Sequence, residues 1–407
     1  FPGAIGRPFW LDEALQAHIS HAPTLIEALS RSAALDLHPP GFTVVAWMST
    51  QILGPAEWAL RMPSLVAGVA TAPLAFAAGR AWGGPRVGQT FAIAAALCPP
   101  WVAYAREARP YAGEIAWVIA ILWAAGVHRK NPSLLTTLAM MATAIGSLCW
   151  QYTGGVIAVG ILAGLAIAAR GDRGAIAAIL TTLVAGLGLF YGILLPQLAH
   201  HNEVAGHLDL SLLTGPVALV GYCAVGSWPW NFIVGLLLLP VVARRPPREL
   251  AIVGLLPVVA LYGLAVLGLH PFGPIRQCLA LTPGLLLIGA HYQFGMGRFL
   301  PLGFAAAVGV MFARFPGVPV WDTPALAEKL EAENSDVAVW LDPRLSRPWA
   351  YYGREIAAEN GVWATLEIPA GQDLWIISVN PPVSPDWGQP RKRLTAPGVT
   401  ATLWVTD

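Results

Sequence analysis

Four stretches of this 407-residue chain contain no Asp, Glu, Lys, Arg or His, and each is long enough to cross a lipid bilayer. They are residues 131–169, 174–199, 210–243 and 250–269. A membrane-spanning helix needs about 20 mostly apolar residues. Only 12% of the chain is charged, whereas soluble domains carry about 25%. The chain is therefore predicted to be an α-helical polytopic membrane protein.

Several other classes of protein find no support in the sequence. The formal net charge of +1 indicates no basic surface for nucleic acid. The four cysteines lie in apolar segments without metal-binding spacing, which argues against disulfides and structural zinc. A P-loop, a GxGxxG loop after a strand, HExxH and GxSxG are absent. Nucleotide hydrolysis, dinucleotide binding and serine or zinc hydrolysis are thus not indicated.

The positive-inside rule orders the membrane part. The loops at 80–86, 128–131, 170–173, 243–249 and 295–298 hold ten Lys or Arg and two acidic residues, so they are predicted to be cytoplasmic. Two further apolar stretches, 39–56 and 210–226, are predicted to lie in the outer interface or to re-enter without crossing. A bundle of about 10–12 membrane helices is expected, with spans near residues 62–79, 87–104, 110–127, 133–150, 153–169, 174–196, 228–243, 250–269, 277–294 and 299–315.

Charge density rises after Val318, where residues 319–407 hold 19 of the 47 Asp, Glu, Lys and Arg residues. This tail is predicted to be a small extracytoplasmic α/β domain, with Gly- and Pro-rich sequence at 381–397. Helices are expected near 324–334 and 349–359, strands near 337–341, 362–368 and 374–379, and an edge strand at 400–405. The predicted domains are a first external loop with juxtamembrane helices (1–61), a transmembrane helical bundle (62–318) and the soluble domain (319–407).

Polar groups at membrane depth are costly and usually mark function, and the first cluster of them pairs Asp12 and Glu13 with Asp36 and His38. Adjacent carboxylates in a partly desolvated site can have pKa values pushed apart, so that one serves as a general base. The alternative is that Asp12 caps a helix over 13–20 and that Asp36 caps a helix opened by two prolines.

The second cluster runs from Tyr104 to Tyr111 and contains two arginines. Arg106 and Arg109 are three residues apart, so on a helix they share a face and can grip an anionic group. A helix that begins at Pro110 would direct backbone N–H groups toward a phosphate. The alternative is an interfacial Arg/Glu network that anchors the bundle.

A third cluster centres on Arg276, in the first turn of a helix opened by Pro274, although alone it is equally a snorkelling anchor. A further polar run contains His200, His201 and Glu203. Its spacing matches no standard metal motif, so a solvated loop is preferred and no metal is predicted.

The order of these motifs resembles that of the multi-pass GT-C glycosyltransferases, and the nearest branch is the protein O-mannosyltransferase and lipid A aminoarabinose transferase one. The resemblance covers roughly the first 130 residues well. The motifs are Trp10-Leu11-Asp12-Glu13, Asp36-Leu37-His38-Pro39-Pro40, Arg61-Met62-Pro63-Ser64 and Tyr104-Ala105-Arg106-Glu107-Ala108-Arg109-Pro110-Tyr111.

The resemblance implies an inverting transfer of a sugar from a polyprenyl phosphate to an acceptor hydroxyl of a lipid, glycan or protein. Such enzymes act at the outer face of the membrane, commonly the bacterial inner membrane. By resemblance Asp12 is the catalytic base and Glu13 lies beside it. The family has a transmembrane helix before the Asp-Glu motif, whereas this chain begins eleven residues ahead of Asp12, so a helix is expected upstream.

The expected roles of the other residues follow from this mechanism. Arg106, Arg109 and Arg276 would neutralise the leaving phosphate, since stabilisation of developing charge is typically the largest catalytic effect. Tyr111, in the same second external loop as Arg106 and Arg109, is also expected to bind the phosphate. Asp36, His38 and Arg61 are expected in support, with His38 bonded to the phosphate or to Asp12. No soluble cofactor is required, although some GT-C members use a divalent metal.

The competing class is a transporter or flippase for lipid-linked sugars, and a third is a polysaccharide polymerase or ligase. A transporter needs polar groups that reach both faces, or helices broken near the midplane. The polar clusters here lie mainly on one side, which favours the transferase. Its predicted partners are the lipid-linked donor, the acceptor and membrane lipids, without nucleic acid.

Overall fold

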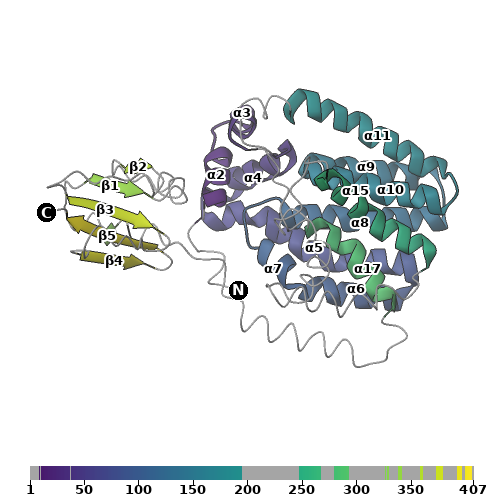
Figure 1. Ribbon diagram of the computed structural model, residues 1–407. Helices are drawn as coiled ribbons and strands as arrows, with labels where there is room; N and C mark the ends of the chain where they lie inside the picture. Colours follow the sequence, from purple (N-terminus) through teal and green to yellow (C-terminus); the bar gives the residue numbers. More distant parts are fainter. Residues whose placement is uncertain are drawn as a thin grey trace. The chain divides into compact units, whose positions relative to one another are not determined.

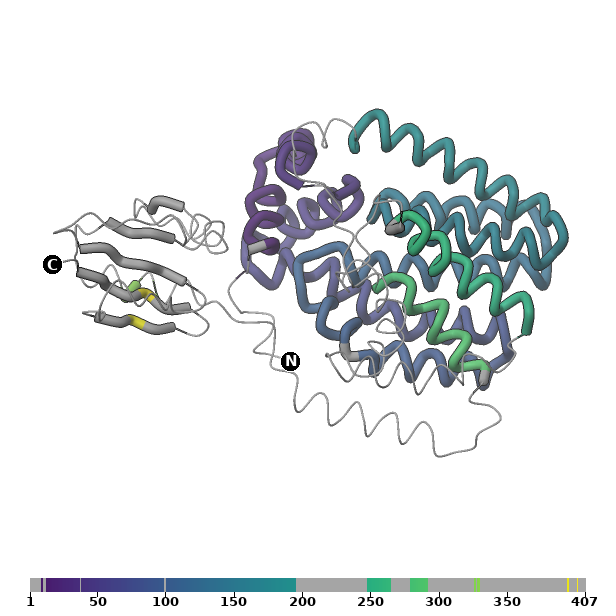
Figure 2. Tube along the Cα trace, viewed as in Figure 1, coloured from purple at the N-terminus to yellow at the C-terminus, as the bar shows by residue number. Residues whose placement is uncertain are grey.

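The computed structural model describes residues 9, 11–36, 38–194, 247–266, 279–292, 326 and 328–329, and five strands between 338 and 405. Figure 2 traces the helical part in colour. The chain forms two compact units, one of Phe1–Pro23, Ser49–Leu60 and Pro316–Asp407 and the other of Thr24–Met48 and Arg61–Phe315. The described helices confirm the predicted polytopic helical fold.

Three helices precede the first long one: α2 (Leu11–Ser20), α3 (Leu25–Leu35) and α4 (Pro40–Leu53). Thr24 caps α3 by accepting the Glu27 backbone N–H at 3.2 Å. The 14 residues of α4 occupy the stretch predicted not to cross, and they fall short of the about 20 that a span needs. The long helix α5 (Glu57–Gly83) follows.

The span predicted at 87–104 is wrong as a single helix. It consists of α6 (Pro85–Leu97) and α7 (Pro99–Tyr104), separated at Cys98. Cys98 has an extended backbone with φ −66° and ψ 109°. The reason is the consecutive pair Pro99-Pro100, because a proline lacks a backbone N–H donor and disfavours the helical conformation of the residue before it.

The predicted spans from residue 110 onward correspond to α8 (Tyr111–Lys130), α9 (Leu134–Trp150), α10 (Tyr152–Ala168), α11 (Arg173–Leu189) with a π-turn (Phe190–Leu194), α15 (Arg248–Val266) and α17 (Thr282–Tyr292). In the described part, α5, α8 and residues Arg173–Leu194 are long and apolar enough to cross a membrane, and three further apolar helices are shorter. The stretches predicted at 210–226, 228–243 and 299–315 lie outside the described residues.

Helix α10 lies at the centre of the bundle, in contact with α8, α9, α11 and α15 (Figure 1). Two glycines one turn apart let α15 approach it closely. A Cβ at Gly160 would lie 2.8 Å from the Cα of Pro257, and one at Gly164 would lie 2.8 Å from the Cα of Val253. Membrane helices associate through such small residues because lipid offers no hydrophobic drive to bring helices together.

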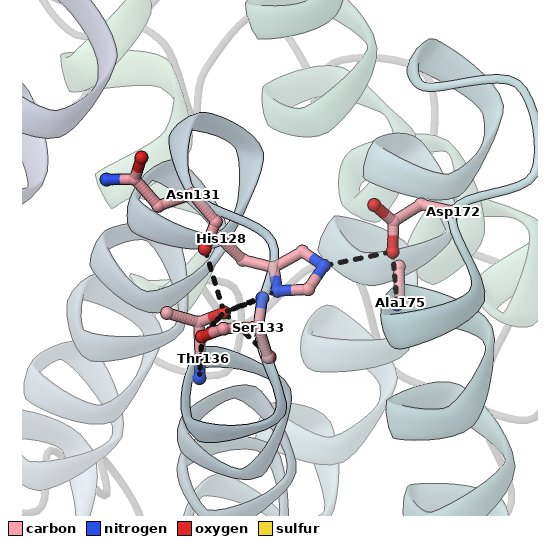
Figure 3. A network of polar contacts seen from close by, with 6 residues as sticks. All are labelled: His128, Asn131, Ser133, Thr136, Asp172 and Ala175. Atoms are coloured by element: carbon pink, nitrogen blue, oxygen red, sulfur yellow. Dashed lines mark hydrogen bonds and ion pairs between the residues drawn. The ribbon is translucent and has the colours of Figure 1, made fainter.

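A polar network joins α8, α9 and α11 at one end of the bundle (Figure 3). His128, 2% exposed, lies between Thr136 Oγ1 at 2.7 Å and Asp172 Oδ1 at 3.1 Å. Asp172 also accepts the Ala175 backbone N–H at 2.8 Å and so caps α11. Thr136 and Ser133 form a capping box at the start of α9. Three helix ends thereby share one set of hydrogen bonds.

The neighbouring basic residues tie further helices to the same end. Arg129 pairs with Glu249 at the start of α15 and lies 5.0 Å from the ring centre of Trp82. Lys130 Nζ donates to the Arg80 carbonyl at 3.3 Å. The structure therefore gathers the loops at 80–86, 128–131 and 170–173 and the start of α15 at one end, as the positive-inside assignment requires.

The C-terminal part contains a mixed five-stranded sheet in the order β2-β1-β3-β5-β4. β1 pairs parallel with β2 and β3, whereas β5 pairs antiparallel with β3 and β4. The strands are β1 (Ala338–Leu341), β2 (Ala358–Asn360), β3 (Asp373–Ser378), β4 (Lys392–Ala396) and β5 (Val399–Val405).

The strands predicted at 337–341 and 374–379 are confirmed, whereas two other predictions for the tail need correction and one strand was missed. The helix predicted over 349–359 cannot reach its last residues, because Ala358–Asn360 is a strand. Residues 399–405 form an internal strand, since β4 pairs with its outer side. β4 itself was not predicted, because its sequence KRLTA is polar, as suits an edge strand. The strand predicted at 362–368 lies outside the described residues.

The close packing of α10 on α15 predicts opposite effects for two Gly→Ala substitutions. Gly160→Ala places a methyl group against the Pro257 backbone and should cost about 1–3 kcal/mol of stability. Gly188→Ala on α11 meets no atom within 4 Å, and should be neutral or stabilising by up to about 1 kcal/mol. Thermal unfolding in detergent measures both. Equal unfolding temperatures for the two variants would contradict the packing described here.

Candidate active site

Asp36, His38 and Arg109 meet at the end of the bundle opposite the His128 network. Asp36 follows the last residue of α3, and Arg109 precedes the start of α8. His38 Nδ1 lies 2.5 Å from Asp36 Oδ1, Arg109 Nη1 donates to Asp36 Oδ2 at 3.4 Å, and Arg109 Nη2 lies 3.4 Å from His38 Nε2. The Asp36 carboxylate thus receives a cation on one oxygen and an imidazole on the other.

The contacts define the tautomer of His38. A guanidinium only donates hydrogen bonds, so His38 Nε2 accepts from Arg109. Nδ1 therefore carries the proton and donates to Asp36. Asp36 and Arg109 are 8% and 5% exposed, so neither charge is fully hydrated, and each depends on the other for stabilisation.

The position of Asp36 corrects the alternative that it caps the helix opened by Pro39 and Pro40. It is the C-terminal cap of α3, with an extended backbone and its N–H bonded to the Ser32 carbonyl. Helix α4 begins only at Pro40. Its carboxylate is therefore directed to His38 and Arg109.

Helix α5 holds the backbone of the arginine. Ser64 Oγ donates to the Arg109 carbonyl at 2.8 Å, and both residues are buried. Arg61 lies one turn earlier on α5 and is only 2% exposed. Residues three apart share a helix face, so the spacing of Arg61 and Ser64 directs both toward the interior. Ser64 was quoted in the sequence motif but was not predicted as a site residue.

Arg106 lies in the same turn as Arg109, between α7 and α8. Its Nε is buried and has no hydrogen-bond partner among the described residues. The neighbouring Tyr104 and Tyr111 rings pack edge to face, with centres 5.0 Å apart and planes at 65°. Tyr111 is only 3% exposed, so its ring serves first as a packing surface for this turn.

Asp12 and Glu13 occupy the first turn of α2, in the other compact unit. Asp12 is half-buried, whereas Glu13 is fully buried. Since α2 begins at Leu11, Asp12 lies inside the helix, and the helix does not start after it as the capping alternative required. His21 directly follows the last residue of α2. Burial lowers the pKa of its imidazole, and the Glu57 carboxylate partly offsets that decrease.

Four of the predicted residues, Arg276, His200, His201 and Glu203, lie outside the described residues. Among the described side chains, no group of three His, Cys, Asp or Glu is placed to hold a metal ion.

Glu114 is a buried residue of this region that the sequence reasoning missed. It lies in the first turn of α8, is 1% exposed, and accepts a hydrogen bond from Thr153 on α10. The sequence did indicate this residue, because Glu114 is the only charged residue in the predicted span 110–127. Carboxylates inside membrane spans usually face the protein interior and are functional.

The chain resembles one known protein family and several solved structures. Residues 37–199 match the profile of the family described as dolichyl-phosphate-mannose-protein mannosyltransferase. No curated protein sequence matches the chain.

Among solved structures, ArnT from Cupriavidus metallidurans bound to undecaprenyl phosphate is similar at a TM-score of 0.58 and 14% identity, over 98% of this chain and 95% of that one. Its apo state gives a TM-score of 0.47 at 16% identity, over the same shares of the two chains. The Archaeoglobus fulgidus oligosaccharyltransferase gives 0.45 at 10% identity, over 86% of this chain and 58% of that one. The similarity to the first structure extends along the whole fold.

The buried pair of Asp36 and Arg109 predicts a large loss of stability when one charge is removed. Asp36→Asn should cost about 3 kcal/mol, because Arg109 then keeps an uncompensated charge in a desolvated position. Glu27→Gln removes the partly exposed pair with Arg31 on α3 and should cost less than about 1 kcal/mol. Unfolding in detergent compares the two variants. An equal loss in both would show that the Asp36 pair is solvated.

Proposed function

Because the chain has the fold of the GT-C membrane glycosyltransferases, we propose that it transfers a sugar from a polyprenyl phosphate to an acceptor hydroxyl. The observation that carries the proposal is the grouping of Arg106 and Arg109 in one buried turn, beside Asp36 and His38. Such a turn can bind an anionic head group at one end of an apolar bundle. The neighbour ArnT, which was solved with undecaprenyl phosphate, supports a lipid phosphate as the ligand.

The two arginines have different roles in this proposal. Asp36 compensates the charge of Arg109, so Arg109 brings geometry and hydrogen bonds more than net charge. The Nε atoms of Arg106 and Arg109 are both buried without a hydrogen-bond partner among the described residues, but of the two only Arg109 pairs with Asp36. A buried donor without a partner costs about 1–3 kcal/mol, and a phosphate oxygen would remove that cost. Because Asp36 does not compensate its charge, Arg106 is the principal phosphate ligand, and Arg109 and Arg276 are the supporting ones.

The reaction step is an in-line displacement. Asp12 removes the proton from the acceptor hydroxyl as the acceptor oxygen forms a bond to C1 of the sugar. The bond from C1 to the phosphate oxygen breaks, and its electron pair leaves with the lipid phosphate. The configuration at C1 inverts. Glu13 stands beside the base, and its burial keeps that part of α2 closed to water.

The arginines act on the charge that develops as the phosphate leaves. Preorganised donors in a poorly hydrated site stabilise such charge more strongly than water does. Ser64 and Arg61 on α5 keep the turn in place. No soluble cofactor enters this scheme, because the polyprenyl phosphate is itself the leaving group.

The proposed orientation puts this end of the bundle on the outer face of a bacterial inner membrane. The Lys/Arg-rich loops gather at the other end, which supports a cytoplasmic location for them. The domain boundaries at 61 and 318 are part of the proposal, with residues 319–407 on the outer side. The acceptor is a lipid, glycan or protein hydroxyl that reaches Asp12 from that side.

Asp12→Asn should abolish sugar transfer, because the amide cannot accept the hydroxyl proton, and should leave binding of the lipid phosphate within about twofold. The assay incubates membranes with undecaprenyl-phosphate-linked hexoses and pentoses that carry labelled sugars. Glu27→Gln, on the exposed face of α3, serves as the matched carboxylate control and should transfer at the wild-type rate.

Equal transfer by wild type and Asp12→Asn would refute the base assignment. Binding of the lipid without any transfer by the wild-type protein would favour a transporter or flippase of lipid-linked sugars.

Arg106→Gln should weaken the binding of undecaprenyl phosphate about 10- to 100-fold, the factor that corresponds to one charge-assisted hydrogen bond of about 1.5–3 kcal/mol. Isothermal titration in detergent measures the affinity. Arg31→Gln, at a half-buried position on α3, is the arginine control and should bind as the wild type does. A similar small effect in both variants would remove Arg106 from the phosphate site.

A further inference from the structure

Trp150, the last residue of α9, contacts the residues beside the Asp36–His38–Arg109 cluster: Pro110, which follows Arg109, and Phe42, four residues after His38. Its indole N–H donates to the Pro110 carbonyl at 2.7 Å. Pro110 directly follows Arg109, and Ser64 holds the Arg109 carbonyl. Two hydrogen bonds from different helices therefore restrain consecutive peptide units at the site.

The ring of Trp150 fits into a recess that a glycine provides. A Cβ at Gly113, in the first turn of α8, would be closer to three atoms of the indole ring than real Cβ atoms come. The ring therefore lies directly on the α8 backbone, one turn after the arginine turn. This contact determines how far the start of α8 lies from the end of α9.

The other edge of Trp150 meets the segment that follows His38. The rings of Phe42 and Trp150 pack edge to face, with centres 5.7 Å apart and planes at 71°. A Cβ at Gly41 would lie 2.5 Å from the Cys149 carbonyl, so the start of α4 also lies against the end of α9. Aromatic pairs of this geometry contribute about 0.5–1.5 kcal/mol beyond their buried area.

We infer that Trp150 is a positioning residue, which holds the turn of Arg109 on one side and the segment of Asp36 and His38 on the other at the separation that their contacts need. The three polar groups meet at 2.5–3.4 Å, although Asp36 and Arg109 are 73 residues apart. The inference rests on the proposed function, since the cluster serves there to bind a lipid phosphate.

The structure contains a matched control in the same pair of helices. Trp117 of α8 lies on Gly146 of α9, where a Cβ would be 2.7 Å from the indole ring. Each of the two helices therefore packs a Trp on a Gly of the other, and the two Trp–Gly pairs lie about 6 Å apart along the helix axis. Both tryptophans are half-buried. Within the described part of the chain, Trp117 makes no hydrogen bond through its indole N–H, and it lies one turn deeper than the site.

The experiment compares Trp150→Phe with Trp117→Phe. Titration calorimetry with undecaprenyl phosphate should show affinity about tenfold weaker for Trp150→Phe, the factor that corresponds to about 1.4 kcal/mol, and within about twofold of wild type for Trp117→Phe. Thermal unfolding should occur at a lower temperature in both variants, because each loses an indole at the same helix interface, and somewhat lower in Trp150→Phe, which also loses the hydrogen bond to Pro110. Hydrogen exchange of residues 105–113 should be faster only in Trp150→Phe.

Equal affinities and equal exchange in the two variants would overturn the inference, since Trp150 would then only pack. Phe42→Leu removes the ring contact and leaves the hydrogen bond to Pro110, and it should weaken binding severalfold. If Trp150→Phe cannot be purified in folded form, the affinity of Phe42→Leu for undecaprenyl phosphate tests the inference in its place. Failure of the wild-type protein to bind undecaprenyl phosphate would refute the proposed function instead, and the exchange of residues 105–113 would still test the role of Trp150.

Discussion

The pairing of Asp36 with Arg109 is the constraint on which the proposed site depends. A guanidinium that is 5% exposed at the end of an apolar bundle is tolerated only with a compensating charge. Asp36 provides that charge and also orients His38, whose remaining ring nitrogen returns to Arg109. The three side chains are mutually bonded, so a rearrangement of one of them leaves a charge unbalanced or removes a hydrogen bond from another.

Close backbone packing is what places these charges. The cluster joins the end of α3 to the turn before α8, and neither segment is regular structure where the side chains meet. Helix α5 restrains the arginine turn through Ser64, and α9 restrains it through Trp150. Glycines at 41 and 113 allow these approaches because they carry no side chain. The precision of the polar site thus comes from the apolar and small residues around it.

The two ends of the bundle use polar groups differently. At the Lys/Arg-rich end, His128, Asp172 and Thr136 satisfy one another and the helix termini. At the other end, Arg106 keeps a buried nitrogen without a described partner. Arg129, at the first end, also has a buried Nε without a partner, but it pairs with Glu249 through another nitrogen. Arg106 makes no such pair with a described residue, as suits a site for an anionic ligand.

The sequence by itself determined the class of the fold. Apolar stretches without charge predict membrane helices because an ionised side chain is costly in lipid, and the distribution of Lys and Arg ordered the loops that the structure gathers at one end. Motif order also pointed to Asp36, His38 and Arg109 as members of one region. The prolines after Cys98 also explain the break between α6 and α7, although the hydrophobic pattern alone predicts one continuous span.

Only the tertiary structure decided how these residues act. It paired Arg109 with Asp36 and left Arg106 outside that pair. It also showed that Ser64 and Trp150 bond to the carbonyls of Arg109 and Pro110, and that Glu114 is buried against Thr153. In the sheet, it made residues 399–405 an internal strand. The physical reason is common to all of these cases: a side chain's partner across 40 to 73 residues is chosen by packing between helices or strands, and short-range sequence patterns carry no record of that choice.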